Sequence, residues 1–342
     1  MRPILTRLAR ALSILCAILF VVSLAVSMLL ANSETRLFDA AIYKNALKSQ
    51  DYYARMPHLM AVQIASNLAS PSPASYYLKF ITAQDWELLI NTLVPQDQIQ
   101  MISEQSLDST FDFLNGKNED PVISIAPLKK ILVANSAEAV SQFLAAQPAC
   151  TIEQLNAILA IVTAGGVLEK SMFCNPPAEV MTSAMPAISI VFESQIAALP
   201  DTIQIVEQSR LTLRDSINKI RLLADLSLLL PLVLLALITL MAVNSMSSWL
   251  KWWGFLLSLG GALTIALVFL AAPLASLAIF YAAAQNKSMV VLQLVSDGLD
   301  VIQVIIQQVT FPILAQAFVI TLAGLVMVAL GALVGRRRKS TI

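Results

Sequence analysis

The chain has 342 residues, of which 57% are hydrophobic and only 13% are charged. A mean hydropathy of +0.74 is well above that of an average soluble domain, so part of the chain is expected to face lipid. The 22 basic and 22 acidic residues cancel, and this neutral balance provides no support for a nucleic-acid partner. Composition therefore predicts an integral membrane protein with the lipid bilayer as its first partner.

The first expected membrane span is residues 11–31, an uncharged run that follows a short N-terminal segment, residues 1–10. At about 1.5 Å per residue, a helix of this length reaches roughly 31 Å, enough to cross the hydrocarbon core. The basic start and the small residues Ala25 and Ser27 also fit a cleaved signal peptide. We favour an uncleaved anchor because the apolar run continues past the candidate cleavage site.

Three further apolar runs predict transmembrane helices at residues 224–243, 252–272 and 311–335. Between the last two, residues 273–310 carry polar side chains every three or four positions, which predicts an amphipathic extracytoplasmic helical segment. This segment is expected to run into the last span at Pro312. Apart from Asp225 at the outer edge of the second span, the spans contain no charged side chain, which argues against proton or ion coupling through them.

The basic residues predict the orientation of the spans, because cytoplasmic segments carry an excess of Lys and Arg. The expected anchors lie in residues 1–10, in the 244–251 turn and in the 336–342 tail. They are Arg2, Arg7, Arg10, Lys251, Arg336, Arg337, Arg338 and Lys339. Residues 32–223 instead hold 19 acidic and 13 basic residues, a balance of minus six. Both termini are therefore expected in the cytoplasm and residues 32–223 outside the plasma (inner) membrane.

Helix signals dominate residues 32–223, and the helix that follows the first span is expected to continue almost to Pro57. Capping motifs begin helices at Thr82 and Thr151, and the latter helix should stop at Gly165–Gly166. Two alternating segments, 121–126 and 202–206, predict a small two-stranded ribbon. The expected fold is a mainly α membrane protein with four transmembrane helices and a mostly helical extracytoplasmic domain.

Cys150 and Cys174 fall within this exported segment, where disulfides form and persist. No His or further Cys lies near them to complete a metal site, and a redox pair would favour a closer CxxC-like spacing. We therefore predict a structural disulfide. Cys16, inside the first span, is interpreted as an apolar packing residue.

Small residues on the later spans have the spacing used in helix packing. They are Gly254, Ser258, Ala262 and Ala266 on the third span, and Gly331 and Gly335 on the fourth. We expect these faces to pack within the four helices of one chain, with a homodimer as the alternative.

No catalytic, cofactor or metal site is predicted. His58 is the only histidine, which excludes a zinc site built from several histidines, and no metalloprotease, hydrolase or nucleotide-binding motif is present. The carboxylate neighbours in the sequence are expected to lie on solvated surfaces.

Several stretches carry a family resemblance: "YYARMPHLM", "ITAQDWELLINTLVP", "FLNGKNEDP", "APLKKIL", "PACT…CNPP" and "WLKWWGFLLSLGGALT". Together they resemble an uncharacterised family of bacterial four-span membrane proteins, and the resemblance implies no activity. The order of spans also resembles permeases of the mechanotransmission type. We expect a non-enzymatic membrane protein whose exported domain binds a partner protein or ligand. The first alternative is a permease-like subunit coupled to a cytoplasmic ATPase. The second alternative is a membrane-anchored extracytoplasmic hydrolase.

Overall fold

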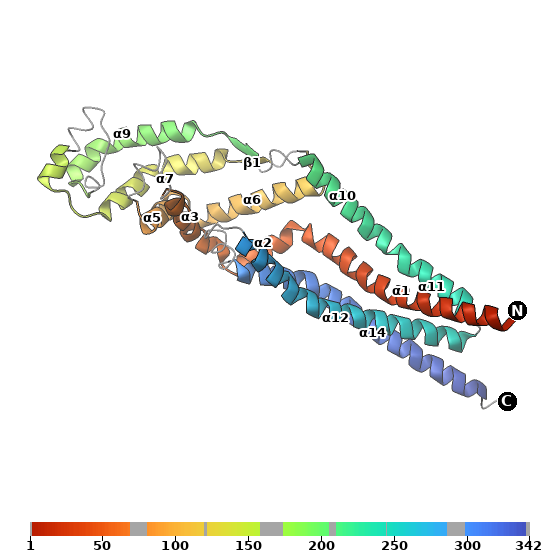
Figure 1. Cartoon of the computed structure of the whole chain (residues 1–342). Coiled ribbons are helices and arrows are strands. Elements are labelled where there is room, and N and C mark those ends of the chain that lie inside the picture. The colour runs from red at the N-terminus through yellow and green to blue at the C-terminus, as the bar shows by residue number, and fades with distance from the viewer. Residues whose placement is uncertain are drawn as a thin grey trace. The chain divides into compact units, whose positions relative to one another are not determined.

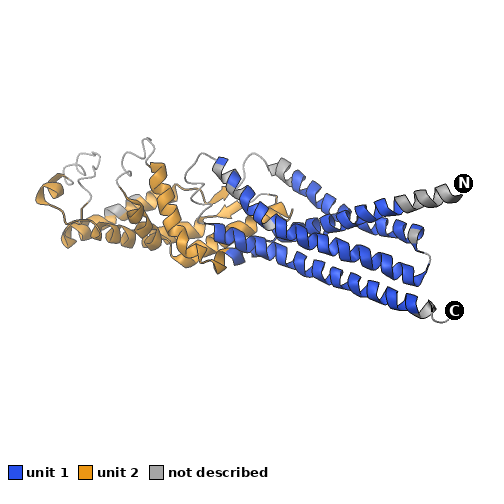
Figure 2. Ribbon diagram, turned by 60° about the horizontal axis from the view of Figure 1, so that its bottom comes forward, with its two compact units in different colours: residues 1–46, 208–342 blue, residues 47–207 orange. Residues whose placement is uncertain are grey.

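The computed structural model describes residues 2–68, 81–119, 122–157, 174–204, 210–243, 245–285 and 298–339. The chain divides into two compact units, shown in blue and orange in Figure 2. Unit 1 consists of residues 1–46 and 208–342, and unit 2 consists of residues 47–207.

Unit 1 contains four helical segments that are long and apolar enough to cross a membrane. They are Leu12–Leu37, Asp215–Met241, Met246–Ala278 and Leu299–Arg336. The first lies in α1 (Arg2–Leu37), and the second in α10 (Arg210–Ser227) with α11 (Leu229–Ala242). The third and fourth lie in α12 (Met246–Gln285) and α14 (Leu299–Lys339). Four such helices indicate a multi-pass membrane protein, as the sequence predicts.

Helix α1 is the shared neighbour within unit 1, because it packs against α10, α11, α12 and α14. α12 and α14 lie side by side along their length (Figure 1). A buried cluster of Cys16, Phe20, Leu234, Leu235, Ile238 and Leu256 joins α1, α11 and α12. The start of α1 and the end of α14 lie at one end of this bundle, as both ribbon views show. Cys16 is buried in that cluster and has a free thiol.

Unit 2 is built from helices that pack in chain order. α3 (Tyr52–Leu68) contacts α5 (Ala83–Leu93), α5 contacts α7 (Ala126–Ala145), and α7 contacts α9 (Ala178–Ala197). α6 (Gln96–Leu114) contacts α3 and strand β1 (Val122–Ser124). β1 pairs antiparallel with β2 (Thr202–Gln204), so the predicted two-stranded ribbon is confirmed. The predicted capping box at Thr82 and Asp85 is also present.

The sequence predicts one long helix from the first span almost to Pro57, but the structure has separate helices there. α1 ends at Leu37, and α2 (Ala40–Ser49) and then α3 follow. The carboxylate of Asp39 accepts a hydrogen bond from the backbone N–H of Ala41, at 2.9 Å, so an N-cap interrupts the helical pattern. Pro57 itself lies inside α3.

Helices continue beyond the apolar runs. The compact unit 2 spans residues 47–207, and the extensions of α1 and α10 pack together in unit 1. α12 continues to Gln285, and α14 runs from Leu299 through Pro312 without interruption. The first part of the expected amphipathic segment, residues 286–297, lies outside the described residues.

Candidate functional site

Helices α7 and α9 form an antiparallel pair. At one end of the pair, Lys129 connects the two helices. This lysine lies in the first turn of α7, and its Nζ donates hydrogen bonds to the carbonyl oxygens of Leu199 at 2.8 Å and Ala197 at 3.3 Å. It also forms an ion pair with Asp201 at 2.7 Å. A cation at a helix C-terminus satisfies carbonyls that have no partner within the helix and interacts favourably with the helix dipole. Lys129 therefore fixes the end of α9 to the beginning of α7.

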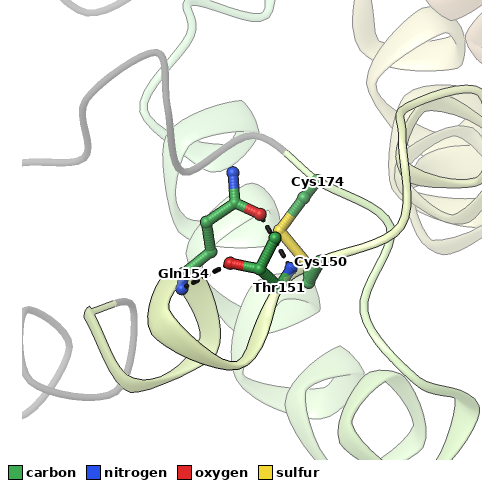
Figure 3. The surroundings of a disulfide bond; sticks show 4 residues. All are labelled: Cys150, Thr151, Gln154 and Cys174. Carbon is green, nitrogen blue, oxygen red and sulfur yellow. Dashed lines mark hydrogen bonds between the residues drawn. A yellow bond between two sulfur atoms is a disulfide. The ribbon is translucent and has the colours of Figure 1, made fainter.

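The opposite end of the pair is held by the disulfide between Cys150 and Cys174, shown in Figure 3. Their Cα atoms are 4.8 Å apart, and the two cysteines are separated by 24 residues in the sequence. The backbone N–H of Cys150 donates to the carbonyl of Asn175 at 3.0 Å, and Asn175 N–H donates to the carbonyl of Pro148 at 2.7 Å. The segment that follows α7 is thus tied to the segment that precedes α9.

The residue after Cys150 begins another helical turn. Thr151 and Gln154 form reciprocal hydrogen bonds between side chain and backbone, at 2.8 and 3.2 Å, as a capping box does (Figure 3). Residues 152–157 are helical, and the predicted stop at Gly165–Gly166 lies outside the described residues. The disulfide therefore lies directly beside a helix start, where the backbone is already ordered.

Between these two connections, one face of α9 carries Val180, Ser183, Ala187, Ile190 and Ser194, which we call the α9 stripe. Their alternating three- and four-residue spacing places them on one side of a helix that turns about 100° per residue. Val180 is 42% exposed and Ile190 is 66% exposed. Ser183 and Ser194 are also exposed, while the side chain of Ala187 lies outside the described residues.

The chemistry of the α9 stripe suits packing rather than catalysis. The Ser183 hydroxyl donates to the carbonyl of Val180 in its own helix, at 2.9 Å, so its donor is already satisfied. The 20 residues of α9 contain two carboxylates, Glu179 and Glu193, and no basic residue. A helical partner with small or apolar residues at the same spacing could approach closely, because the stripe has three small side chains and two branched ones.

The described part of unit 2 also brings together His58 and Glu87, a pair that sequence reasoning did not identify. His58 Nδ1 lies 2.7 Å from a carboxylate oxygen of Glu87, and both side chains are substantially exposed. No group of three or more His, Cys, Asp or Glu residues that could hold a metal ion occurs among the described residues. The pair is an exposed hydrogen-bonded contact between α3 and α5.

Tyr53 on α3 is the most perturbed titratable group described outside the membrane spans. Its side chain is 3% exposed, and its hydroxyl has no hydrogen-bond partner in the described part of the chain. Burial and, secondarily, the nearby carboxylate of Glu104 raise the pKa of Tyr53 to about 12. The phenol therefore stays neutral at ordinary pH and is a poor nucleophile or general base.

Of the small residues predicted to pack on the third span, two lie against α14 and two are exposed. Gly254 lies so close to α14 that an added Cβ would be 2.5 Å from the carbonyl oxygen of Gly324, and Ser258 lies beside Thr321. Ala262 and Ala266 are exposed, and Gly261 contacts α14 in their place. Successive four-residue steps rotate about 40° around a helix, so a stripe with strict four-residue spacing leaves the interface.

Gly331 and Gly335 pack against the beginning of α12 in the same chain. A Cβ added at Gly331 would be 3.0 Å from Leu250, and one at Gly335 would be 2.9 Å from Ser247. Ser247 also donates a hydrogen bond to the carbonyl of Gly331, at 2.7 Å. These contacts are made within one copy of the chain.

The expected topology anchors lie toward that same end of the bundle. Lys251 and Arg336 are exposed. Arg2, Arg7 and Arg10 belong to α1, and Arg337, Arg338 and Lys339 to α14, but their side chains lie outside the described residues.

The α9 stripe is the functional candidate that sequence reasoning missed. Its signal is present as V-x-x-S-x-x-x-A-x-x-I-x-x-x-S from residue 180 to residue 194, a heptad-like spacing. The spacing alone could mark a buried core face, because periodicity identifies a face of a helix and not what covers it. Only the packing of α7 on another side of α9 shows that this face is exposed.

The fold and the candidate site together define a multi-pass helical membrane protein with a second, helical unit. Comparison with protein-family models, with curated proteins and with solved structures finds no match to this chain.

Proposed function

We propose that this chain is a non-enzymatic protein of the bacterial plasma membrane, with both termini in the cytoplasm. In this proposal its exported unit 2 binds a helix of a partner protein on the α9 stripe. The observation that carries the proposal is the exposed face of α9, a helix held at both ends by Lys129 and by the Cys150–Cys174 disulfide. The face of a helix that is held at both ends loses little conformational entropy on binding, which favours its use as a docking surface.

The proposed orientation is supported by charge. Basic residues cluster in residues 1–10 and in the 336–342 tail, whereas residues 32–223 have a net charge of minus six from 19 acidic and 13 basic residues. The disulfide in unit 2 supports an oxidising compartment for that unit, since disulfides are rare in the cytoplasm.

A helical partner is favoured by the size and shape of the stripe. It spans 15 residues, from Val180 to Ser194, and the 14 steps between its ends cover about 21 Å at 1.5 Å per residue. Covering Ile190, which is 66% exposed, would contribute roughly 1–2 kcal/mol, since full burial of such a side chain contributes about 1.5–3 kcal/mol. The absence of basic residues from α9 predicts that the partner helix is neutral or basic beside Glu179 and Glu193.

A photoreactive amino acid at Ile190 is expected to crosslink the intact protein to a partner in living cells. Position Asn118 is a matched control, because it is also exposed in unit 2 but lies in the polar segment after α6. A second substitution, Val180→Asp, should reduce the Ile190 adduct at least tenfold, because it places a charge in the apolar contact. The adduct is measured by its mass shift and identified by mass spectrometry.

Equal crosslinking at Asn118, or an Ile190 adduct that survives Val180→Asp, would contradict the proposal. An adduct of two identical chains would assign the partner helix to a second copy. A lipid adduct alone would remove the α9 stripe as a protein-binding surface.

Orientation is tested separately with single cysteines introduced at Asn118 and Ser340. A membrane-impermeant maleimide added to intact spheroplasts should label Asn118→Cys and leave Ser340→Cys unlabelled until the membrane is permeabilised, because the charge asymmetry places them on opposite sides. Labelling of both positions in intact spheroplasts would overturn the orientation.

A further inference from the structure

Arg36, in the last turn of α1, lies in a groove with the outer face of α14. The groove has a volume of about 590 Å³ and is lined by Arg36, Val304, Gln307, Gln308, Phe311 and Pro312. All six residues belong to unit 1. The groove thus combines one guanidinium and two amides with an apolar floor, and Phe311 is 72% exposed.

The polar groups in the groove are available to a ligand. In the part of the chain that the structure describes, the Arg36 guanidinium and the side-chain amides of Gln307 and Gln308 have no hydrogen-bond or ion-pair partner. Arg221, a second arginine in the same unit, differs: it lies 3.0 Å from Glu34 and packs over the ring of Phe38 at 4.8 Å. One arginine is therefore neutralised within the protein, and Arg36 keeps an uncompensated positive charge.

The depth of the groove corresponds to lipid head groups. Arg36 lies five residues beyond the uncharged run that ends at Ala31, or about 7 Å along the helix. Gln307 lies four residues before the apolar run that begins at Phe311, or about 6 Å. The head-group layer extends roughly 5–7 Å beyond the hydrocarbon core on each side. Arg36 and Gln307 are thus at phosphate level, while Phe311 and Pro312 are at the level where acyl chains begin.

We propose that this groove binds one phospholipid from the leaflet around this end of the bundle, with the phosphate at Arg36 and the acyl chains against Phe311 and Pro312. Arg36 and the amides of Gln307 and Gln308 donate hydrogen bonds to the phosphate oxygens, which a planar guanidinium does well. A lone exposed arginine holds a free anion weakly in water. In a phospholipid the phosphate is joined to acyl chains, and their contact with Phe311 and Pro312 helps to keep the phosphate at Arg36. The inference is independent of the α9 stripe and of the orientation of the chain.

The test uses the full-length protein, delipidated in detergent, with bound lipid counted by native mass spectrometry. Phosphatidylglycerol should bind at least tenfold more tightly than diacylglycerol with the same chains, because diacylglycerol lacks the phosphate that accepts the charge-assisted hydrogen bonds of Arg36. Arg36→Gln should lower phosphatidylglycerol binding about tenfold. Arg36→Lys should lower phosphatidylglycerol binding less, because lysine keeps the positive charge and loses only the paired N–H donors of the guanidinium.

Lys219→Gln is the matched control, since it removes an exposed positive charge from α10 in the same unit without touching the groove. It should bind lipid as the unmodified protein does. Equal losses in Arg36→Gln and Lys219→Gln would show a general charge effect and overturn the site. Equal binding of diacylglycerol by the unmodified protein would overturn the phosphate contact whatever the variants do. Displacement of the lipid by glycerol 3-phosphate at matched concentration would assign a soluble-anion site and overturn the lipid.

Discussion

Replacing both Cys150 and Cys174 with serine is expected to destabilise unit 2 by roughly 3.5 kcal/mol, the chain-entropy contribution of closing a loop of this length. The disulfide spans a 24-residue separation and holds the end of α7 to the beginning of α9. Without it, the backbone hydrogen bonds between Asn175 and its neighbours Pro148 and Cys150 still join this end of the pair, but no covalent link does. Limited proteolysis of the intact protein in its membrane should reveal the change, with cleavage within residues 47–207 accelerated by roughly 300-fold at most.

The matched control is Cys16→Ser, which alters a buried cysteine in the membrane unit that takes no part in the bridge. It should leave the protease resistance of unit 2 unchanged. Thiol labelling after unfolding without reductant should detect only Cys16 in the unmodified protein, and all three cysteines after reduction. Full labelling of Cys150 and Cys174 without reductant would exclude the bridge. A bridged protein whose double variant keeps its protease resistance would show that the bridge has a negligible effect on stability.

Gly261→Ala is expected to destabilise the membrane bundle by about 1–3 kcal/mol, the usual cost of overpacking. A Cβ added at Gly261 would overlap the hydroxyl oxygen of Thr321 and lie 2.7 Å from the carbonyl oxygen of Ala317. The second of these atoms belongs to the backbone of α14, so the two helices must move apart. The midpoint of unfolding in mixed detergent and SDS micelles, followed by circular dichroism, measures the effect.

The adjacent Gly260 provides a control with the same change of side chain. A Cβ there would approach Cδ2 of Leu24 at 2.6 Å, and that atom ends a flexible side chain that can rotate away. Gly260→Ala should therefore be neutral or slightly stabilising, because alanine has the higher helix propensity. Equal effects at the two positions would show that the approach of α12 to α14 is not limited by the backbone contact at Gly261.

The sequence alone determined the features that depend on local chemistry. Uncharged runs of sufficient length identify the four spans, because every backbone polar group in a bilayer must be satisfied within the helix. The capping boxes at Thr82 and Thr151 were readable because their partners lie three residues away. The ribbon between β1 and β2 was predicted from two alternating segments, although some 80 residues separate them. Pairing was the simplest arrangement for two short strands in a helical unit.

Tertiary structure decided the features that depend on which face meets which neighbour. Gly254 is buried against α14 while Ala262 and Ala266 are exposed, because the position of the partner helix selects among the small residues around α12. Lys129 reaches Asp201 across 72 residues, a contact that no local pattern predicts. The exposure of Ile190, and the lack of a side-chain partner for Arg36 among the described residues, likewise follow from where α7, α10 and α14 pack. Periodicity defines a surface along a helix, but only the surrounding helices determine whether that surface is buried, paired or left open to a ligand.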